Sequence, residues 1–198
     1  TFPKSDKVDH SKVTFVNRFG ITLAADLYVP KIAVADKFPA IAVSGPFGAV
    51  KEQSSGLYAQ TLAERGFLTI AFDPSFTGES SGQPRSVASP DINTEDFSAA
   101  VDYLATRPDV DAERIGILGI CGWGGFAINA AANDTRIKAT VASTMYDISR
   151  ANANGYFDAA DNADARYRMR RELNAQRTKD YRTGTYPCTT MNPEPAED

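Results

Sequence analysis

One stretch, residues 114–133, constrains the fold of this chain more than any other. It runs Arg114-Ile-Gly-Ile-Leu-Gly-Ile-Cys-Gly-Trp-Gly-Gly-Phe-Ala-Ile-Asn-Ala-Ala-Ala-Asn133. Residues 115–120 are apolar and partly β-branched, which is typical of a buried strand, whereas the part from Trp123 has apolar residues at helical spacing. Cys121 lies between the two parts among glycines. A strand that turns sharply into a helix would therefore present the Cys121 thiol at the tip of the turn.

This pattern has two interpretations at the local level. With sulfur in place of oxygen it is similar to the nucleophile elbow G-x-S-x-G, because Gly119 stands two residues before Cys121. The position two residues after it is Trp123 rather than glycine. A free cysteine is also often a compact core residue, so a Gly-rich strand–helix turn with a buried thiol is the alternative.

Length, charge and cysteine content exclude several classes of protein. A chain of 198 residues suits one domain with a hydrophobic core. Its net charge of −4 argues against binding to nucleic acid or an anionic membrane. Neither a transmembrane run nor a signal-peptide core is present, so we expect a cytoplasmic protein, although an initial Thr leaves the true N-terminus open. Cys121 and Cys188 alone make no disulfide framework or metal cluster. We expect no cofactor and no metal.

The order of apolar runs predicts an α/β fold. Strand-like runs occupy Val13–Arg18, Ile21–Val29, Phe38–Ser44, Phe67–Phe72, Ile115–Ile120 and Ile137–Thr144. Helical spacing extends from Ser54 or Ser55 to Arg65, and starts again at Thr94 and at Trp123. A hairpin followed by alternating strands and helices gives a mostly parallel, doubly wound sheet covered on both faces. Ligands bind at the carboxyl ends of such strands, where Cys121 is expected.

Three segments are expected along the chain: an N-terminal arm (1–12), the α/β core (13–145), and a lid or cap segment with a polar tail (146–198). Residues 163–179 can form one helix, whose arginines we interpret mainly as a solvated face. The tail from Tyr186 contains three prolines and acidic residues, and we expect it to be extended or mobile.

Four segments carry a resemblance to a known family: Ile21–Tyr28, Gly48–Gln53, Ala71–Ser80 and Gly116–Gly125. With these segments the chain resembles the α/β-hydrolase superfamily, within it the dienelactone-hydrolase-like branch of predicted esterases, from about Phe15 to Arg150. The resemblance implies that Cys121 attacks an ester or lactone carbonyl to give a thioacyl intermediate that water resolves. It implies an oxyanion hole from the backbone N–H groups of Gly122 and Phe47, since Pro46 has no N–H.

The general base is missing from this pattern. In the superfamily the order is nucleophile, Asp or Glu, then His, yet no histidine follows Cys121. We interpret His10, the single histidine, as a surface residue of the arm. The chain would then be an N-terminal portion, and a C-terminal fragment or second chain would supply the acid and the histidine. Asp147 could be the acid or a helix cap.

Further polar and aromatic residues border the predicted site. Asp73 and Glu79 are expected to order their loop, and Glu52 to be a first-turn helix carboxylate, although each lies on the active face. Aromatic side chains could line an acyl pocket or simply pack in the core; these are Phe47, Phe76, Trp123 and Tyr146.

The predicted function is a cysteine-dependent hydrolase of small-molecule esters or lactones, with homo-oligomerisation possible. An acyltransferase on the same scaffold is the first alternative. A non-catalytic, ligand-binding relative with a vestigial elbow is the second, and the lack of a second histidine favours it if the chain is whole.

Overall fold

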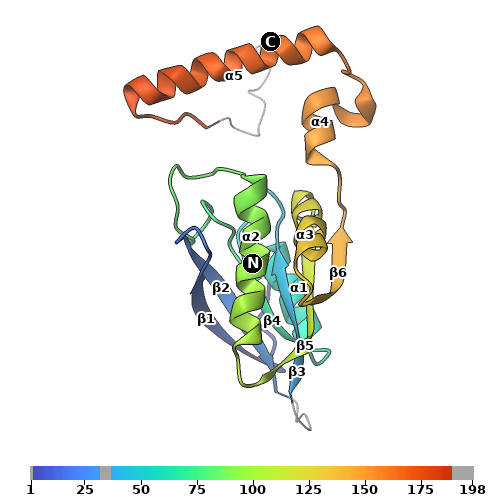
Figure 1. Cartoon of the computed structure of the whole chain (residues 1–198). Coiled ribbons are helices and arrows are strands. Elements are labelled where there is room, and N and C mark those ends of the chain that lie inside the picture. Colours follow the sequence, from blue (N-terminus) through green and yellow to red (C-terminus); the bar gives the residue numbers. More distant parts are fainter. Residues whose placement is uncertain (1, 32–36, 189–198) are drawn as a thin grey trace. The chain divides into compact units, whose positions relative to one another are not determined.

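Figure 1 shows a computed structural model of the chain, which describes residues 2–31 and 37–188. Most of the tail that we expected to be extended, residues 189–198, therefore lies outside the described residues. The chain divides into two compact units, Thr1–Ile148 and Ser149–Asp198. Within the described ranges, no helix combines the length and the apolar character that a membrane crossing needs.

The first unit is built on one six-stranded sheet with the order β1-β2-β4-β3-β5-β6. Its strands are β1 (Val8–Val16), β2 (Thr22–Pro30), β3 (Phe38–Ser44), β4 (Leu68–Phe72), β5 (Val110–Ile120) and β6 (Ile137–Ser143). β1 pairs antiparallel with β2, and β2 with β4, while β3, β4, β5 and β6 run parallel. The prediction of a mostly parallel α/β sheet that begins with a hairpin is thus confirmed.

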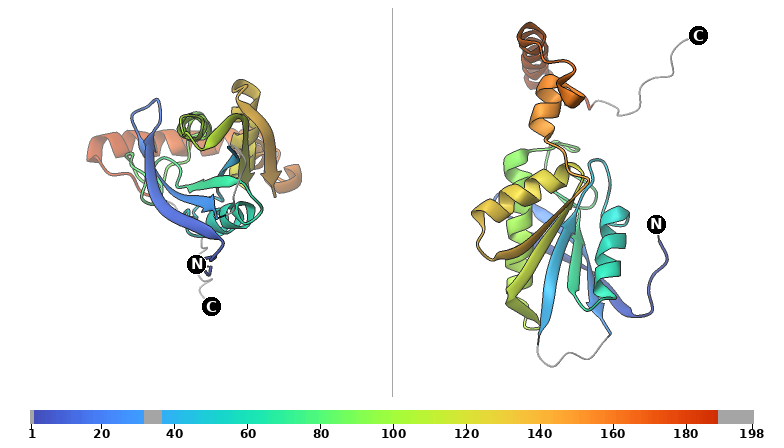
Figure 2. Two further views of the ribbon diagram at one scale, coloured as in Figure 1. Left: turned by 90° about the horizontal axis from the view of Figure 1, so that it is seen from below. Right: turned by 90° about the vertical axis from the view of Figure 1, so that its right-hand side faces the viewer.

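Three helices cover the sheet. α1 (Ser54–Ala63) packs on β4, β3 and β2, whereas α2 (Pro90–Ala105) and α3 (Gly122–Asn133) pack on the opposite face (Figure 2, right). The main core lies under α2 and α3 and includes Leu23, Ile70 and Ile117; the smaller core under α1 includes Val43 and Leu118. Because the central strands are buried on both faces, their sequences are nearly continuous apolar runs.

Three elements start earlier than the apolar pattern predicted. One is β5, which begins at Val110 rather than Ile115. β1 begins at Val8 rather than Val13, so half of it lies in the segment expected to be an arm. This strand lies at the sheet edge, and its apolar residues alternate with polar ones, so the sequence gives only a weak strand pattern there. α2 begins at Pro90 rather than Thr94, because proline fits the first helical position and Asn93 accepts a hydrogen bond from the Ser89 N–H at 2.8 Å.

One face of the sheet is less covered than expected. No described element of the first unit covers the α1-side face where it passes from β5 to β6, and the Val141 side chain there is 52% exposed. A hollow of about 490 Å³ extends over this region and is lined mostly by apolar atoms, with Ile41 and Leu62 on its wall. The expectation of a sheet covered on both faces therefore holds for β2, β4 and β3 only.

The second unit is helical. α4 (Ile148–Asn154) is followed by a short 3₁₀ turn, η1 (Tyr156–Asp158), and by α5 (Ala163–Thr183). The Asn162 side chain caps α5 by accepting a hydrogen bond from the Ala165 N–H at 3.0 Å, and Gly184 ends the helix in the left-handed conformation. None of the residues of α5 is buried within the described chain, in agreement with the solvated face predicted for its arginines.

Candidate functional site

Cys121 occupies the junction between β5 and α3. Its backbone has φ 60° and ψ −126°, a positive φ that few residues other than glycine adopt. The conformation is held by hydrogen bonds on both sides: the Cys121 N–H donates to the Ser143 carbonyl at 2.8 Å, and the Gly124 N–H donates to the Cys121 carbonyl at 2.9 Å. Neither cysteine forms a disulfide, and the Cys121 side chain is half-buried. A sharp strand–helix turn with a cysteine at its tip is therefore present.

Close contacts between this turn and its neighbours require small residues around it. A Cβ added at Gly119 would lie 2.2 Å from the Trp123 carbonyl oxygen, and one at Gly122 would lie 2.0 Å from the Phe47 ring. The departure of Trp123 from the G-x-S-x-G pattern also has a steric explanation. Its Cβ faces Gly45, where an added Cβ would be only 2.9 Å away. The helix can therefore carry Trp123 at this position, because the facing loop has a glycine, Gly45, at the point of contact.

Phe47 lies on the loop that follows β3 and contacts the first turn of α3. The loop is a turn in which the Ala49 N–H donates to the Pro46 carbonyl at 3.2 Å, with Gly48 at φ 73°. In such a turn the N–H of the second residue, here Phe47, is left unused. The N–H of Gly122 belongs to the first turn of α3, where no acceptor exists within the helix. The site therefore has two backbone donors on adjoining segments.

An aromatic cluster adjoins the cysteine. The Phe47 and Trp123 rings meet edge to face with centroids 4.4 Å apart, and Phe126 packs against both. Trp123 is 3% exposed, and its Nε1–H has no acceptor among the described residues. Phe76 is part of the main core, which is the packing alternative of the sequence prediction, while Tyr146 follows β6.

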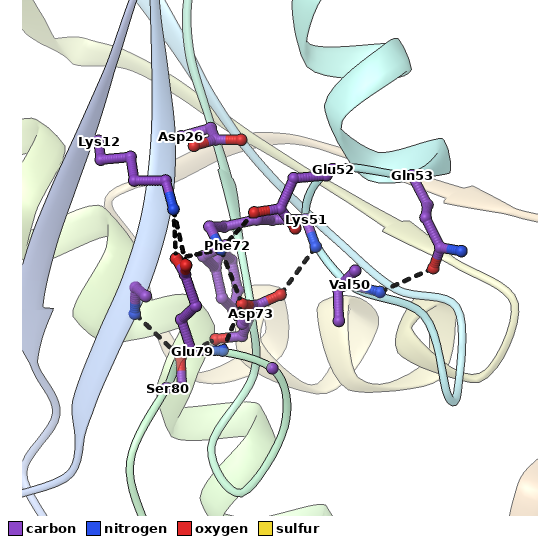
Figure 3. A network of polar contacts seen from close by, with 12 residues as sticks. Lys12, Asp26, Val50, Lys51, Glu52, Gln53, Phe72, Asp73, Glu79 and Ser80 are labelled. Carbon is purple, nitrogen blue, oxygen red and sulfur yellow. Dashed lines mark hydrogen bonds and ion pairs between the residues drawn. The ribbon is translucent and has the colours of Figure 1, made fainter. Parts of the chain in front are cut away.

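A network of buried charges fixes the loop that carries Phe47 (Figure 3). The Lys51 side chain is 1% exposed, and its ammonium contacts Asp73 at 3.0 Å, Glu79 at 2.7 Å and Glu52 at 2.8 Å. The Lys51 backbone N–H donates to the other Asp73 oxygen at 2.7 Å. One residue thus joins the loop after β3 to the loop after β4, through its backbone and its side chain together.

The charges within this network are mutually stabilised. Burial opposes the charge on Lys51, but the carboxylates of Glu52, Glu79 and Asp73 outweigh it and raise the lysine pKa above its ordinary value. Hydrogen bonds from Lys12 and Lys51 lower the pKa of Glu79 to about 2. Lys51 and Glu79 therefore stay charged at neutral pH.

The acidic residues that the sequence placed on the active face serve mainly to order loops. Asp73 is buried and accepts hydrogen bonds from the backbone N–H groups of Lys51 and Glu79, as expected of a loop-ordering residue. Glu52 contacts the Lys51 ammonium. Asp147 directly precedes α4, the position at which an aspartate caps a helix.

His10 does not approach Cys121. It lies on the edge strand β1, with β2, β4 and β3 between that strand and β5, so the two residues are about 19 Å apart across the sheet. Its ring contacts Asp26 and Tyr28 instead. Among the described residues, no group of three or more His, Cys, Asp and Glu side chains could hold a metal ion.

Lys51 and Gly45 are the residues of this region that sequence reasoning missed. Lys51 gave a weak signal, because a lysine next to Glu52 in a loop is ordinarily a solvated residue. Its burial depends on Asp73 and Glu79, which lie 22 and 28 residues further along the chain. Only the pairing of β3 with β4 brings these positions together.

Comparison with known proteins places this architecture in a family. Residues 20–195 match the model of the X-Pro dipeptidyl-peptidase (S15) family. The chain belongs to this family. The fold predicted from the sequence is confirmed by a solved structure, that of the α/β hydrolase GrgF from a Penicillium species, which superposes with a TM-score of 0.75 over 91% of this chain and 57% of that one. At 24% identity, GrgF shows the shared fold alone.

Two relatives of this S15-family chain show higher identity. The uncharacterised protein PA2218 of Pseudomonas aeruginosa is 65% identical over 93% of this chain and 50% of its own length. Its crystal structure gives a TM-score of 0.93 over the whole of this chain and 62% of that one. A thiohydrolase of Aspergillus aculeatus, aneE, is 33% identical over 68% of this chain and 41% of its own length. The chain thus spans about half the length of the curated relatives it matches.

Proposed function

We propose that this S15-family chain carries the nucleophile of a hydrolase that cleaves small carboxylic esters or lactones through Cys121. The Cys121 sulfur attacks the carbonyl carbon, the alcohol leaves, and a thioacyl enzyme remains that water hydrolyses. The position and backbone of Cys121, at positive φ on the β5–α3 turn, are the observations that carry this proposal.

The surroundings of the cysteine support the same chemistry. The N–H groups of Phe47 and Gly122 stabilise the oxyanion, since both lie on segments that meet beside Cys121 and lack an acceptor in their own turn or helix. The Lys51 network holds the Phe47 loop in place. The name of the relative aneE, a thiohydrolase, is compatible with acyl cleavage on this scaffold.

The base and the acid come, in this proposal, from a further segment or a second chain. His10 is bound to the opposite edge of the sheet, and the described residues bring no imidazole to Cys121. The exposed edge strand β6 and the apolar hollow beside it offer a surface against which such a segment could complete the site.

The test is selective modification of the two cysteines. Iodoacetamide at neutral pH, followed by peptide mapping, should label half-buried Cys121 faster than exposed Cys188, because activation rather than access decides the rate. With p-nitrophenyl acetate, an acetyl group should appear on the Cys121 peptide as p-nitrophenol is released. Cys121→Ala should lose the adduct, and the matched control Cys188→Ala should keep it.

Two results would overturn this proposal. The first is labelling in the order of exposure, with Cys188 ahead. The second is unfolding of Cys121→Ala in circular dichroism, which would make Cys121 a packing residue. The acyltransferase alternative is separated by adding an alcohol or amine: transfer of the acetyl group to it, in place of release as acetate, would favour a transferase.

A further inference from the structure

A second pocket lies far from Cys121, between the hairpin β1–β2 and α1. Its volume is about 340 Å³, near the lower limit for sites that hold small organic molecules. It is lined by Asp26 and Tyr28 of β2, His10 and Lys12 of β1, Glu52 and Gln60 from the α1 side, and Phe2 and Lys4 of the segment before β1. The lining is mixed, with aromatic rings around a few polar atoms. Apart from Glu52, which contacts the Lys51 ammonium, none of these residues belongs to the site of Cys121.

Asp26 is the residue in this pocket that has a buried polar atom without a hydrogen-bond partner. It is 2% exposed, and its Oδ1 accepts no hydrogen bond from any described residue. In Figure 3 it stands beside the Lys51 network without a dashed line to it. Burial of a carboxylate oxygen without a donor costs free energy that a partner would recover. The one basic group within 4 Å of this carboxylate among the described residues is the His10 ring, whose Nε2 is 3.3 Å from Oδ1 without hydrogen-bond geometry.

The nearby basic groups do not neutralise Asp26. The Lys4 ammonium is 3.3 Å from His10 Nδ1, and since an ammonium can only donate, Nδ1 must accept. Lys12 lies directly opposite Asp26 in the β1–β2 register, but its ammonium donates to both Glu79 oxygens at 2.6 and 2.8 Å. The charge of Asp26 is therefore left for a ligand.

The Tyr28 phenol and the aromatic rings add further features that suit a cation. Burial, and then the charges of Asp26 and Glu52, raise the pKa of the Tyr28 phenol above its ordinary value. The phenol thus stays protonated, and its oxygen can still accept a hydrogen bond. The side chains of Phe2, His10 and Tyr28 provide aromatic surfaces, which attract organic cations.

We propose that this pocket binds a small organic cation bearing a primary ammonium group, which donates to Asp26 Oδ1 and neutralises its charge. A metal ion does not fit, because the described residues hold no group of metal-binding side chains there. An anion is disfavoured, because the buried atom without a partner is an acceptor and the lysines of the lining, Lys4 and Lys12, already contact His10 and Glu79. The alkyl part of the ligand would pack on the Phe2 and Tyr28 rings.

The proposal is tested with three probes of equal size: pentylammonium, 1-pentanol and butanoate. Each is titrated into the ¹⁵N-labelled chain, and amide shifts are followed by NMR. Pentylammonium should shift the amides of residues 10, 26, 28 and 60 in a saturable way, and the other two probes should not. Asp26→Asn should weaken pentylammonium binding by about tenfold or more, since a charged acceptor is lost. Tyr28→Phe should weaken it less.

The matched control is Asp9→Asn. This change removes the same charge one residue from His10, but on the opposite face of β1, where Asp9 contacts Lys31 at the surface. It should leave binding unchanged. Equal weakening by Asp9→Asn would mean general charge attraction and would overturn the proposal. Shifts confined to the Cys121 region, or no saturable shift with pentylammonium, would overturn it as well. If Asp26→Asn fails to fold, unchanged binding in Tyr28→Phe decides against the pocket.

Discussion

The two flanks of Cys121 in the first unit differ: on one the charged groups are paired, and on the other an apolar surface is uncovered. On the β4 side, the loops after β3 and β4 are joined through Lys51, whose ammonium contacts three carboxylates while being almost fully buried. On the β6 side, the sheet ends in an edge strand with an exposed valine and an apolar hollow. Both flanks belong to one sheet.

This difference indicates which part of the site is preorganised. Buried ion pairs with good geometry hold a single arrangement of their loops, and the Phe47 loop gains its position in this way. An exposed apolar face gives no such constraint, and it is the kind of surface that another segment covers. In our proposal, the oxyanion side of the site is therefore the preorganised one, and the acid–base side is the one that a further segment would supply.

The largest expected effect comes from removing the lysine of the buried flank. Lys51→Met leaves Asp73 buried without its cation, and breaking such a pair costs about 3–5 kcal/mol of unfolding free energy. Urea denaturation followed by circular dichroism measures it.

The matched control for Lys51 is on the other flank. Lys138→Met removes a lysine of β6 whose ammonium is 3.2 Å from Glu113 at the surface, and it should cost less than about 1 kcal/mol. Similar losses in the two variants would refute the contrast between the flanks.

A smaller effect is expected from one substitution made at two places in the same sheet row. Val43 and Val141 flank Leu118 in register, but Val43 is fully buried and Val141 is 52% exposed. Val43→Thr should cost about 1–3 kcal/mol, because it buries a hydroxyl. Val141→Thr should stay within about 0.5 kcal/mol. Urea unfolding measures both. If Val141→Thr lowers the unfolding free energy as much as Val43→Thr does, the β6 face is covered in the chain.

The smallest effect concerns pH. Glu79 has a pKa of about 2 in the folded chain against an ordinary 4.5, so it contributes stability above pH 4.5 that is lost as the pH falls towards 2. Glu79→Gln should therefore flatten the decline of Tm across this interval. Because the Glu79 side chain is 53% exposed, solvent screening keeps the difference small. Parallel Tm curves for the two proteins would show that Glu79 adds nothing to the Lys51 network.

The sheet and the elbow could be predicted from the sequence because both depend on local patterns. The continuous apolar runs of β3, β4 and β5 identify strands buried on both faces, and the glycines around Cys121 identify the turn. The start of β1 could not be found this way, since an edge strand needs apolar residues on one face only and its polar residues resemble those of a loop.

The electrostatic part of the site could not be predicted, because it depends on contacts between distant segments. Lys51, Asp73 and Glu79 are each ordinary loop residues in the sequence, and only the parallel pairing of β3 with β4 makes them one network. His10 shows the same limit: interpreted as a surface residue of an arm, it lies half-buried against Asp26 and Tyr28.

The burial of Trp123 has a spectroscopic consequence. It is the single tryptophan of the sequence, it lies two residues from Cys121, and its ring meets Phe47 of the facing loop at 4.4 Å. Its indole N–H has no acceptor among the described residues, so a new oxygen nearby would change its emission. The intrinsic fluorescence of the chain is therefore a label-free reporter that the fold places beside the proposed nucleophile, against a background from tyrosines alone.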